Sequence, residues 1–378
     1  MSRNVASLMV YNLFRGLSTG GYMALFSAYM ARQGFTMSEI GLAVSISGIA
    51  SAIASPFVGY LLEVRSSKSV SVLTGLMLVA SLLLMLPRPS LPLMTLSYSL
   101  FLISFFFSQP ARMTYIARNV ERGRLGRAVG MTASAFTIAR TAGPPLAGYV
   151  AVSYGYASSF SLLALSALLG ALQFQLTSSE DKPERRGSYG IMDSYRNTVK
   201  PPRELLPFYL FVILDRAGWM LWFPMLSAYL VMGGLDEAAI GALYASANLL
   251  EAIAMPLTGR VVDRLGAAFA LVASEILAAS AALSLAIGVL GAPLSFLLMG
   301  LSLSFWIPGY NVYVAKKYER MGEVFASTNA VRSLAGAPSS YVGGVLYSVV
   351  APIAPLLLSS LMLVAAAALM LKVRDNNS

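Results

Sequence analysis

Eight charged side chains lie within stretches of sequence that are otherwise apolar and long enough to cross a bilayer. A charge at the centre of a membrane helix costs at least about 2.5 kcal/mol, so such residues are usually paired or functional. A buried carboxyl can carry a proton, whereas the planar arginine fork binds carboxylate or phosphate groups. The eight residues are Arg15, Arg112, Arg140, Asp215, Arg216, Glu251, Glu275 and Arg332.

Two of the acids are candidates for carrying a proton. Tyr244, Asn248 and Glu251 are spaced at i, i+4 and i+7, which places them on one face of a helix. Glu251 lies near the middle of its apolar stretch, where burial favours the neutral carboxyl, so it is the first choice for proton coupling. Asp215 is the second choice, because an adjacent arginine favours its charged form, and Glu275 is expected to be structural.

Several other chemistries are excluded. The chain contains no cysteine and no histidine. Without cysteine there can be no disulfide, thiolate nucleophile or thiol-ligated metal, and without histidine the commonest metal ligand is missing. The sequence also lacks an H-E-x-x-H motif and a phosphate-binding loop. We therefore expect no cofactor, no metal and no enzymatic activity, and any coupled proton must be carried by a carboxylate.

Membrane-spanning helices must position the charged residues. A span needs about 20 mostly apolar residues, and such stretches recur along the 378 residues, which are 57% hydrophobic and 12% charged. The predicted fold class is an all-α membrane protein with twelve transmembrane helices. The spans are expected at residues 6–31, 38–63, 69–87, 92–117, 127–152, 156–176, 204–231, 237–262, 267–290, 293–315, 323–349 and 351–371.

Basic residues indicate how these helices are oriented. With the N-terminus inside, the inside loops and tails hold 20 of the 27 Lys and Arg residues, and the outside loops hold two. Cytoplasmic loops are enriched in Lys and Arg, so both termini are predicted to be cytoplasmic in a multi-pass protein of the cell membrane. The net charge of +10 then reflects orientation and contacts with membrane lipid, and no nucleic-acid partner is expected.

The two halves of the chain are copies of each other. The polar segment 177–203 has six spans on either side, so we predict an N-terminal six-helix bundle at 1–176, a cytoplasmic linker at 177–203 and a C-terminal six-helix bundle at 204–378. Similar residues recur at a nearly constant offset of about 200 positions, which indicates a duplication. The pairs include Tyr29 with Tyr229, Gly41 with Gly241, Pro56 with Pro256, Gly59 with Gly259, and Gly148 with Gly344.

The loops after the second and eighth spans carry a related motif. The first reads G-Y-L-L-E-V-R and the second G-R-V-V-D-R-L-G. The second copy resembles the G-x-x-x-D-R-x-G signature of the major facilitator superfamily, and the first departs from it at the acid and at the following arginine. The resemblance covers the whole chain and implies a secondary active transporter with alternating access. It also implies a conformational latch formed by Gly59, Glu63, Arg65, Gly259, Asp263 and Arg264.

The fifth span contains a second motif, Arg140-Thr-Ala-Gly143-Pro144-Pro-Leu-Ala-Gly148. It resembles the G-P-x-x-G-G motif of the family's antiporting exporters, with alanine in place of one glycine. Glycine and proline together permit close helix contact and a bend, which suits a helix between two bundles. The resemblance implies export by antiport, and the alternative is ordinary packing of small residues.

The resemblance further implies a central cavity between the first and seventh helices. Arg15 and Asp215 are repeat equivalents on these helices, so they are expected to lie near one another. Trp219 and Trp222 follow Asp215 by four and seven residues and are expected on its helical face. Aromatic and polar residues at mid-depth would line a partly apolar pocket. The expected substrate-binding residues are Arg15, Tyr22, Gln109, Arg140, Asp215, Trp219, Trp222, Asn248, Trp306, Tyr310, Asn329 and Arg332.

Two functions are open from sequence. Proton-coupled export of amphipathic compounds is favoured by the fifth-span motif, the aromatic residues and the buried acids. Transport of organic anions that bear a carboxylate or phosphate is favoured by the excess of intramembrane arginines over acids. The expected partners are a small-molecule substrate, H⁺ as the coupling ion and membrane lipid, and the protein is expected to act as a monomer.

Overall fold

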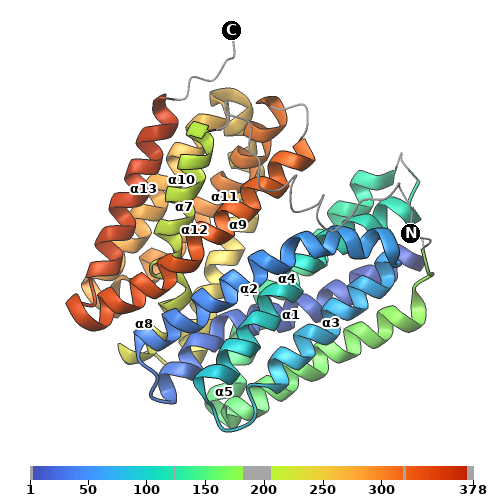
Figure 1. The fold of residues 1–378 in the computed structure, drawn as a ribbon, viewed down its shortest axis with the longest axis horizontal. Helices are drawn as coiled ribbons and strands as arrows, with labels where there is room; N and C mark the ends of the chain where they lie inside the picture. Colours follow the sequence, from blue (N-terminus) through green and yellow to red (C-terminus); the bar gives the residue numbers. More distant parts are fainter. Residues whose placement is uncertain (1–2, 122–123, 182–205, 318–320, 373–378) are drawn as a thin grey trace. The chain divides into compact units, whose positions relative to one another are not determined.

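Helices make up all the regular structure in the part of the chain that the computed structural model describes, which is residues 3–121, 124–181, 206–317 and 321–372 (Figure 1). Seven helical stretches within these ranges are long and apolar enough to cross a membrane. An all-helical membrane protein is therefore confirmed. Most of the expected cytoplasmic linker, at 182–203, lies outside the described residues.

Some of these stretches are too long for one crossing and reverse direction. Helix α5 (Leu125–Thr177) has 53 residues, whereas one span needs about 20. Within it, Gly155 has a φ of 84°, which glycine adopts without strain. The Ser159 hydroxyl donates to the Ala147 carbonyl at 2.8 Å, although the 12 intervening steps of straight helix would span about 18 Å. The chain therefore folds back at Gly155.

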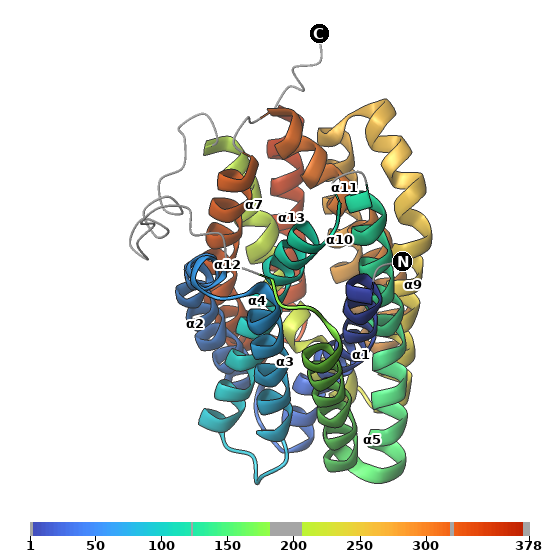
Figure 2. The same cartoon turned by 90° about the vertical axis from the view of Figure 1, so that its right-hand side faces the viewer.

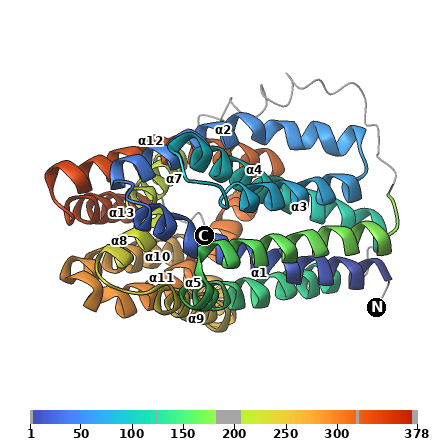
Figure 3. The same cartoon turned by 90° about the horizontal axis from the view of Figure 1, so that it is seen from below.

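The chain divides into two compact units, and the first consists of Met1–Tyr29, Ile46–Arg196 and Asp236–Ala242. Within it, α3 packs on α4 and on α5. Figure 3 shows α1 beside α5. Besides α5, the helices that contribute to this unit are most of α1 (Arg3–Arg32), the C-terminal part of α2 (Met37–Val64), α3 (Ser67–Leu83), α4 (Leu91–Asn119) and the first residues of α9 (Glu237–Leu265).

Small residues set the spacing of α1 and α5 in the first unit. A Cβ atom added to Gly16 would lie 2.4 Å from the Phe136 carbonyl oxygen, and one added to Gly143 would lie 2.3 Å from the Leu17 carbonyl oxygen. Real Cβ atoms do not approach so closely, so both positions require glycine. Gly143, part of the motif in the fifth span, therefore packs two helices of one unit together.

The second unit consists of Met30–Ser45, Asn197–Leu235 and Leu243–Ser378. Within it, α10 packs on α11 and α13, and α7 packs on α12 and α13 (Figure 2). It also contains the N-terminal part of α2 and the rest of α9. Its other elements are α7 (Leu206–Met220), the 3₁₀ turn Phe223–Met225, α8 (Leu226–Met232), α10 (Ala267–Ser284), the 3₁₀ segment Leu285–Gly291, α11 (Ala292–Lys317), α12 (Met321–Val345), the π-helical turn Leu346–Val350 and α13 (Ala354–Lys372).

The span expected at 204–231 is not one straight helix. The 3₁₀ turn Phe223–Met225 separates α7 from α8. Pro224 lies in this turn, and proline removes an N–H donor and clashes with the preceding helical turn. The expectation that Trp222 shares the helical face of Asp215 is therefore wrong, because α7 ends before Trp222.

Repeat-equivalent glycines make equivalent close contacts. In the second unit, a Cβ on Gly41 of α2 would lie 2.3 Å from the Ser340 carbonyl oxygen of α12. In the first unit, a Cβ on Gly241 of α9 would lie 2.4 Å from the Pro144 carbonyl oxygen of α5. The duplication thus reappears as packing of α2 on α12 and of α9 on α5. Because α2 and α9 are each divided between the units, the bundle boundaries expected from sequence stay a prediction.

Candidate functional site

In the second unit, Arg332 of α12 joins a buried acid to a pair of aromatic rings. Its Nη2 lies 3.4 Å from Oδ2 of Asp215 on α7, and the two side chains are 18% and 1% exposed. Its guanidinium carbon lies 4.1 Å from the ring centre of Trp306 on α11, which stacks on Tyr310 with centres 4.6 Å apart. These four residues form the Arg332 cluster. The acid and the ring faces together stabilise the arginine among apolar helices.

Local features of α11 and α12 place this cluster. Gly336 lies one turn after Arg332, and a Cβ there would lie 3.2 Å from Cγ of Arg216, so the glycine makes room for that side chain against α12. The hydroxyls of Tyr310 and Thr328 hydrogen bond with each other and tie α11 to α12. The cluster therefore depends on the packing of three helices.

A further acid, Glu275 of α10, is fully buried in the same unit. Neither of its carboxyl oxygens has a hydrogen-bond partner among the described residues. Asp215 and Arg332 both lie within its electrostatic reach. Glu251 of α9, the first choice for proton coupling from sequence, is 5% exposed. Glu275, Asp215 and Glu251 are therefore all buried acids of the second unit, and the proton-coupling role expected for Glu251 and Asp215 stays a prediction.

In the first unit, Arg15 of α1 and Arg112 of α4 form a second charged group. Arg15 is 3% exposed and donates to the carbonyl and hydroxyl oxygens of Ser104, each at 2.8 Å. Arg112 donates to Oδ1 of Asn12 at 2.8 Å, and its guanidinium carbon lies 4.8 Å from the ring centre of Phe136. Neither arginine takes part in the ion pairs formed among the described residues. This interior is therefore electropositive.

Arg15 and Asp215 each bind inside their own unit. Arg15 is held by Ser104 and by the hydroxyl of Tyr11, which accepts at 3.3 Å. Asp215 is paired with Arg332. The expectation that Arg15 and Asp215 lie near one another across a cavity stays a prediction.

Other residues expected at a substrate site differ in exposure. Tyr22 is fully buried, its hydroxyl hydrogen bonds with Ser97 at 2.8 Å, and its ring stacks on Phe101 at 4.3 Å, so it lies in the core of the first unit.

Trp219 and Trp222 are buried, and their rings stack with centres 5.6 Å apart. Gln109 is exposed, Arg140 and Asn248 are half-buried, and the side chain of Asn329 lies outside the described part.

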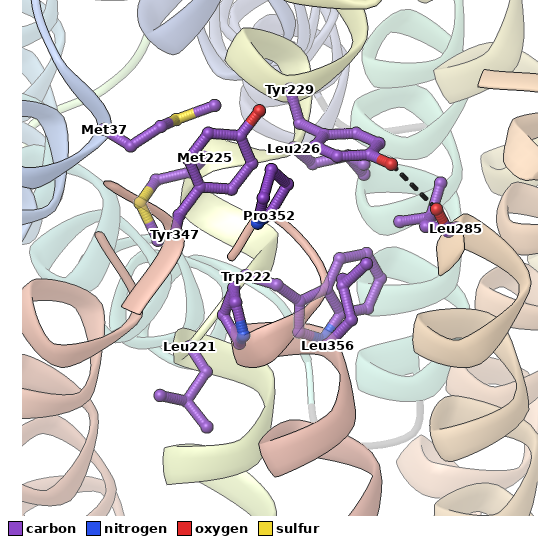
Figure 4. Close-up of a pocket in the computed structure, with 11 residues that line it drawn as sticks. Met37, Leu221, Trp222, Met225, Leu226, Tyr229, Leu285, Tyr347, Pro352 and Leu356 are labelled. Atoms are coloured by element: carbon purple, nitrogen blue, oxygen red, sulfur yellow. Dashed lines mark hydrogen bonds between the residues drawn. The ribbon is translucent and has the colours of Figure 1, made fainter. Parts of the chain in front are cut away.

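A small apolar cavity, about 20 Å³ in volume, lies beside Trp222 in the second unit (Figure 4). Met225, Tyr229 and Tyr347 contribute to its wall, and its lining contains no charged side chain. The Tyr229 hydroxyl donates to the Leu285 carbonyl at 2.8 Å, which satisfies the polar end of that ring. Among the described residues expected to bind substrate, only Trp222 lines this cavity, and the aromatic pocket expected from sequence stays a prediction.

Asp181, which no sequence motif indicated, organises the loop between α2 and α3. It accepts the backbone N–H groups of Ser67 and Lys68, each at 3.0 Å, the Ser67 hydroxyl at 2.6 Å and Arg118 Nη1 at 2.9 Å. Burial alone would raise the pKa of Asp181, but hydrogen bonds from Ser67, Arg118 and Lys68 together hold that pKa below its ordinary value. The carboxylate therefore caps the N-terminus of α3.

The residues expected to form a latch are mostly exposed. Arg65, Asp263 and Arg264 are exposed, and Glu63 is half-buried. Gly59 is exposed, and Gly259 has open space where a Cβ would lie. Their role as a latch stays a prediction. In the first unit, the loop after α2 is held by the buried Asp181 and not by the motif residues themselves.

The chain matches the family model described as Major Facilitator Superfamily over residues 8–340. Its fold is similar to the crystal structure of nucleoside transporter NupG, with a TM-score of 0.78 and 15% identity, covering 99% of this chain and 100% of that chain. It is also similar to a POT family transporter in complex with thioalcohol conjugated peptide (TM-score 0.75, 13% identity, 98% and 95% covered). A third similar structure is peptide transporter POT in complex with alafosfalin (TM-score 0.77, 14% identity, 98% and 93% covered). No curated protein sequence matches the chain.

Proposed function

Because the chain belongs to the Major Facilitator Superfamily, we propose that it is a proton-coupled secondary transporter that exports small amphipathic compounds by alternating access. Family membership makes the protein a membrane transporter of a small molecule and not an enzyme. The proposal adds the coupling ion, the direction of transport and the kind of solute.

The observation that carries the proposal is the Arg332 cluster. Trp306 and Tyr310 present stacked rings beside a charge pair that their helices hold within apolar surroundings. A solute with a flat apolar part could stack on the rings while its polar end meets Arg332 or Asp215. The proteins of similar fold include a nucleoside transporter and a peptide transporter, and both nucleosides and peptides are small solutes.

We further propose twelve spans with both termini in the cytoplasm, in a protein that acts as a monomer in the cell membrane. The reversal of α5 at Gly155 supports two crossings for that helix. The stretch Ala267–Ala315 has 49 residues, and within it Ser295 donates to the Ala281 carbonyl at 2.8 Å, which supports two more. The distribution of Lys and Arg supports the orientation.

The motif around Gly143 and Pro144 supports the direction of transport. Gly143 packs closely on α1, and the Pro144 carbonyl faces Gly241 of α9. Small residues at these positions let the backbones of α5, α1 and α9 approach closely. This suits a helix that changes partners during an antiport cycle.

Ligand-dependent thermal unfolding of the purified protein in detergent is the first test. The panel contains tetraphenylphosphonium as a cation, benzoate as an anion and neutral lipophilic dyes. A compound at 100 times its Kd adds about 2.7 kcal/mol of stability, enough to detect. A stabilising compound is then loaded into vesicles, and a proton gradient is imposed. Export that is driven by inward proton flow supports the proposal. A transport rate that does not depend on the proton gradient contradicts it.

Organic-anion transport is the second candidate, favoured by Arg112 in the electropositive interior of the first unit. Arg112 is half-buried beside Phe136, and neither it nor Arg15 takes part in the ion pairs among the described residues. An aromatic carboxylate could pair with Arg112 and stack on the ring. Stabilisation by benzoate alone, lost in Arg112→Gln, would favour this function over export of cations and neutral lipophiles.

A further inference from the structure

Glu275 is buried in a way that an ionised carboxylate does not tolerate. It lies in α10 with an exposed fraction of 0%. Among the described residues, neither Oε1 nor Oε2 has a hydrogen-bond partner. A buried carboxylate without hydrogen bonds or a paired cation costs several kcal/mol, so the group takes up a proton instead. This geometry favours the neutral carboxylic acid at Glu275.

The charged neighbours of Glu275 come from two other helices. Glu275 interacts electrostatically with Asp215 of α7 and with Arg332 of α12. Asp215 in turn interacts electrostatically with Arg216. On α11, packed directly against α10, Tyr310 faces Arg332. Helix α13 also packs on α10 and has no titratable residue between Ala354 and Met370, and α10 itself has none besides Glu275.

Two acids therefore compete for one arginine. Asp215 is as fully buried as Glu275, and its carboxyl oxygens likewise lack hydrogen-bond partners among the described residues. What distinguishes it is Arg332, which lies 3.4 Å away and favours its charged form. If Arg332 moved from Asp215 to Glu275, the cation would stabilise the charged form of Glu275, and Arg216 would remain beside Asp215. The two pairings exclude each other because one guanidinium cannot compensate both carboxylates at this depth.

We propose that Glu275 is the proton-binding site of this transporter, protonated while Arg332 is paired with Asp215 and deprotonated when Arg332 turns to Glu275. In that step the O–H bond of the Glu275 carboxyl breaks, the proton passes to water, and the carboxylate pairs with the guanidinium. The inference rests on the proposed proton coupling for its role in transport. It assigns the proton to Glu275, where sequence alone favoured Glu251 and gave Glu275 a structural role.

Infrared spectroscopy of the full-length protein in lipid vesicles tests the assignment. A protonated carboxylic acid has a carbonyl stretch that is separate from the amide bands and shifts in deuterated water. Wild type is expected to show this band at neutral pH, and Glu275→Gln is expected to lose it. Asp215→Asn is expected to lose most of it as well, because Arg332 is then released to Glu275.

The matched control is Glu251→Gln, which replaces another buried glutamate among the described residues of this unit and should leave the band unchanged. A band that persists in Glu275→Gln, or one that disappears in Glu251→Gln, overturns the assignment to Glu275. A band of full intensity in Asp215→Asn overturns the exchange of Arg332. Wild type is informative without any variant, since the absence of the band at neutral pH also overturns the proposal.

Failure of proton coupling is recognised separately. If the band behaves as expected while a proton gradient does not drive transport in vesicles, Glu275 binds a proton and the coupling in the proposed function is wrong. If the gradient drives transport and Glu275→Gln keeps the band, coupling stands and another acid carries the proton.

Discussion

The carboxylate of Asp181 accepts the backbone N–H of Ser67 at 3.0 Å across a separation of 114 residues in the chain. Through this contact the segment after α5 caps the first turn of α3. Arg118 adds a charged donor at 2.9 Å and also donates to the Leu62 carbonyl at 3.0 Å. One acid therefore connects α2, α3, α4 and the end of α5 in the first unit.

Replacement of this acid should weaken the first unit. Asp181→Asn is expected to lower the free energy of unfolding by about 1–2 kcal/mol, because the neutral amide loses a charge-assisted cap. The folded state lowers the pKa of Asp181, so the stabilisation is present above about pH 4 and is lost as the pH falls through the folded pKa. Thermal unfolding of both proteins from neutral to acidic pH measures this.

The control for Asp181 is Glu121→Gln. Glu121 pairs with Arg124 at 3.6 Å, but the two side chains are 80% and 78% exposed, respectively. Exposed pairs of this kind contribute between about 0 and 1 kcal/mol. If the stability difference between wild type and Asp181→Asn were as large at acidic pH as at neutral pH, the charge of Asp181 would not be what stabilises the loop.

Loss of the cation in the Arg332 cluster should cost more than loss of the whole pair. Arg332→Met leaves Asp215 buried without its nearest cation, and about 3 kcal/mol or more of stability should be lost. Adding Asp215→Asn should restore part of that loss, since no charge then needs compensation. Thermal unfolding of the two single variants and the double variant gives the coupling energy. Strictly additive losses would mean that the two residues do not interact.

The packing of α5 on α9 at Gly148 should not tolerate a side chain at that position. A Cβ on Gly148 of α5 would lie 2.1 Å from the Glu237 carbonyl oxygen of α9, so Gly148→Ala is expected to cost about 1–3 kcal/mol. Gly130 is the control on the same helix, because nothing lies within 4 Å of a Cβ there. Gly130→Ala should leave the unfolding temperature unchanged or raise it. Equal effects of the two substitutions would argue against the close approach of α5 and α9.

Arg15 should act in folding and not in solute binding. It is buried and donates to Ser104 and Tyr11, so Arg15→Gln should cost about 1–3 kcal/mol by leaving buried acceptors unsatisfied. Arg65→Gln, at an exposed arginine, is the control and should have no effect on stability. If Arg15→Gln left thermal unfolding intact but abolished ligand stabilisation, Arg15 would instead bind the solute.

Much of this architecture could be predicted from the order of residues alone. The length and frequency of apolar stretches dictate membrane helices, because an unpaired backbone group in hydrocarbon costs several kcal/mol. The repeat also predicted equivalent roles for equivalent positions, and the contacts of Gly41 and Gly241 follow it. Family membership followed from motifs and was then supported by the match over residues 8–340.

Pairing of charges could not be predicted in the same way. Composition indicated that Asp215, Glu275 and Arg332 lie in membrane helices, but not that α7, α10 and α12 bring them together, nor that Pro224 ends α7 before Trp222. Asp181 had no motif, since its partners lie more than 60 residues away. Apolar patterning is local and repeats along a helix, whereas the partner of a buried charge is set by which helices pack together, and only the tertiary structure decides that.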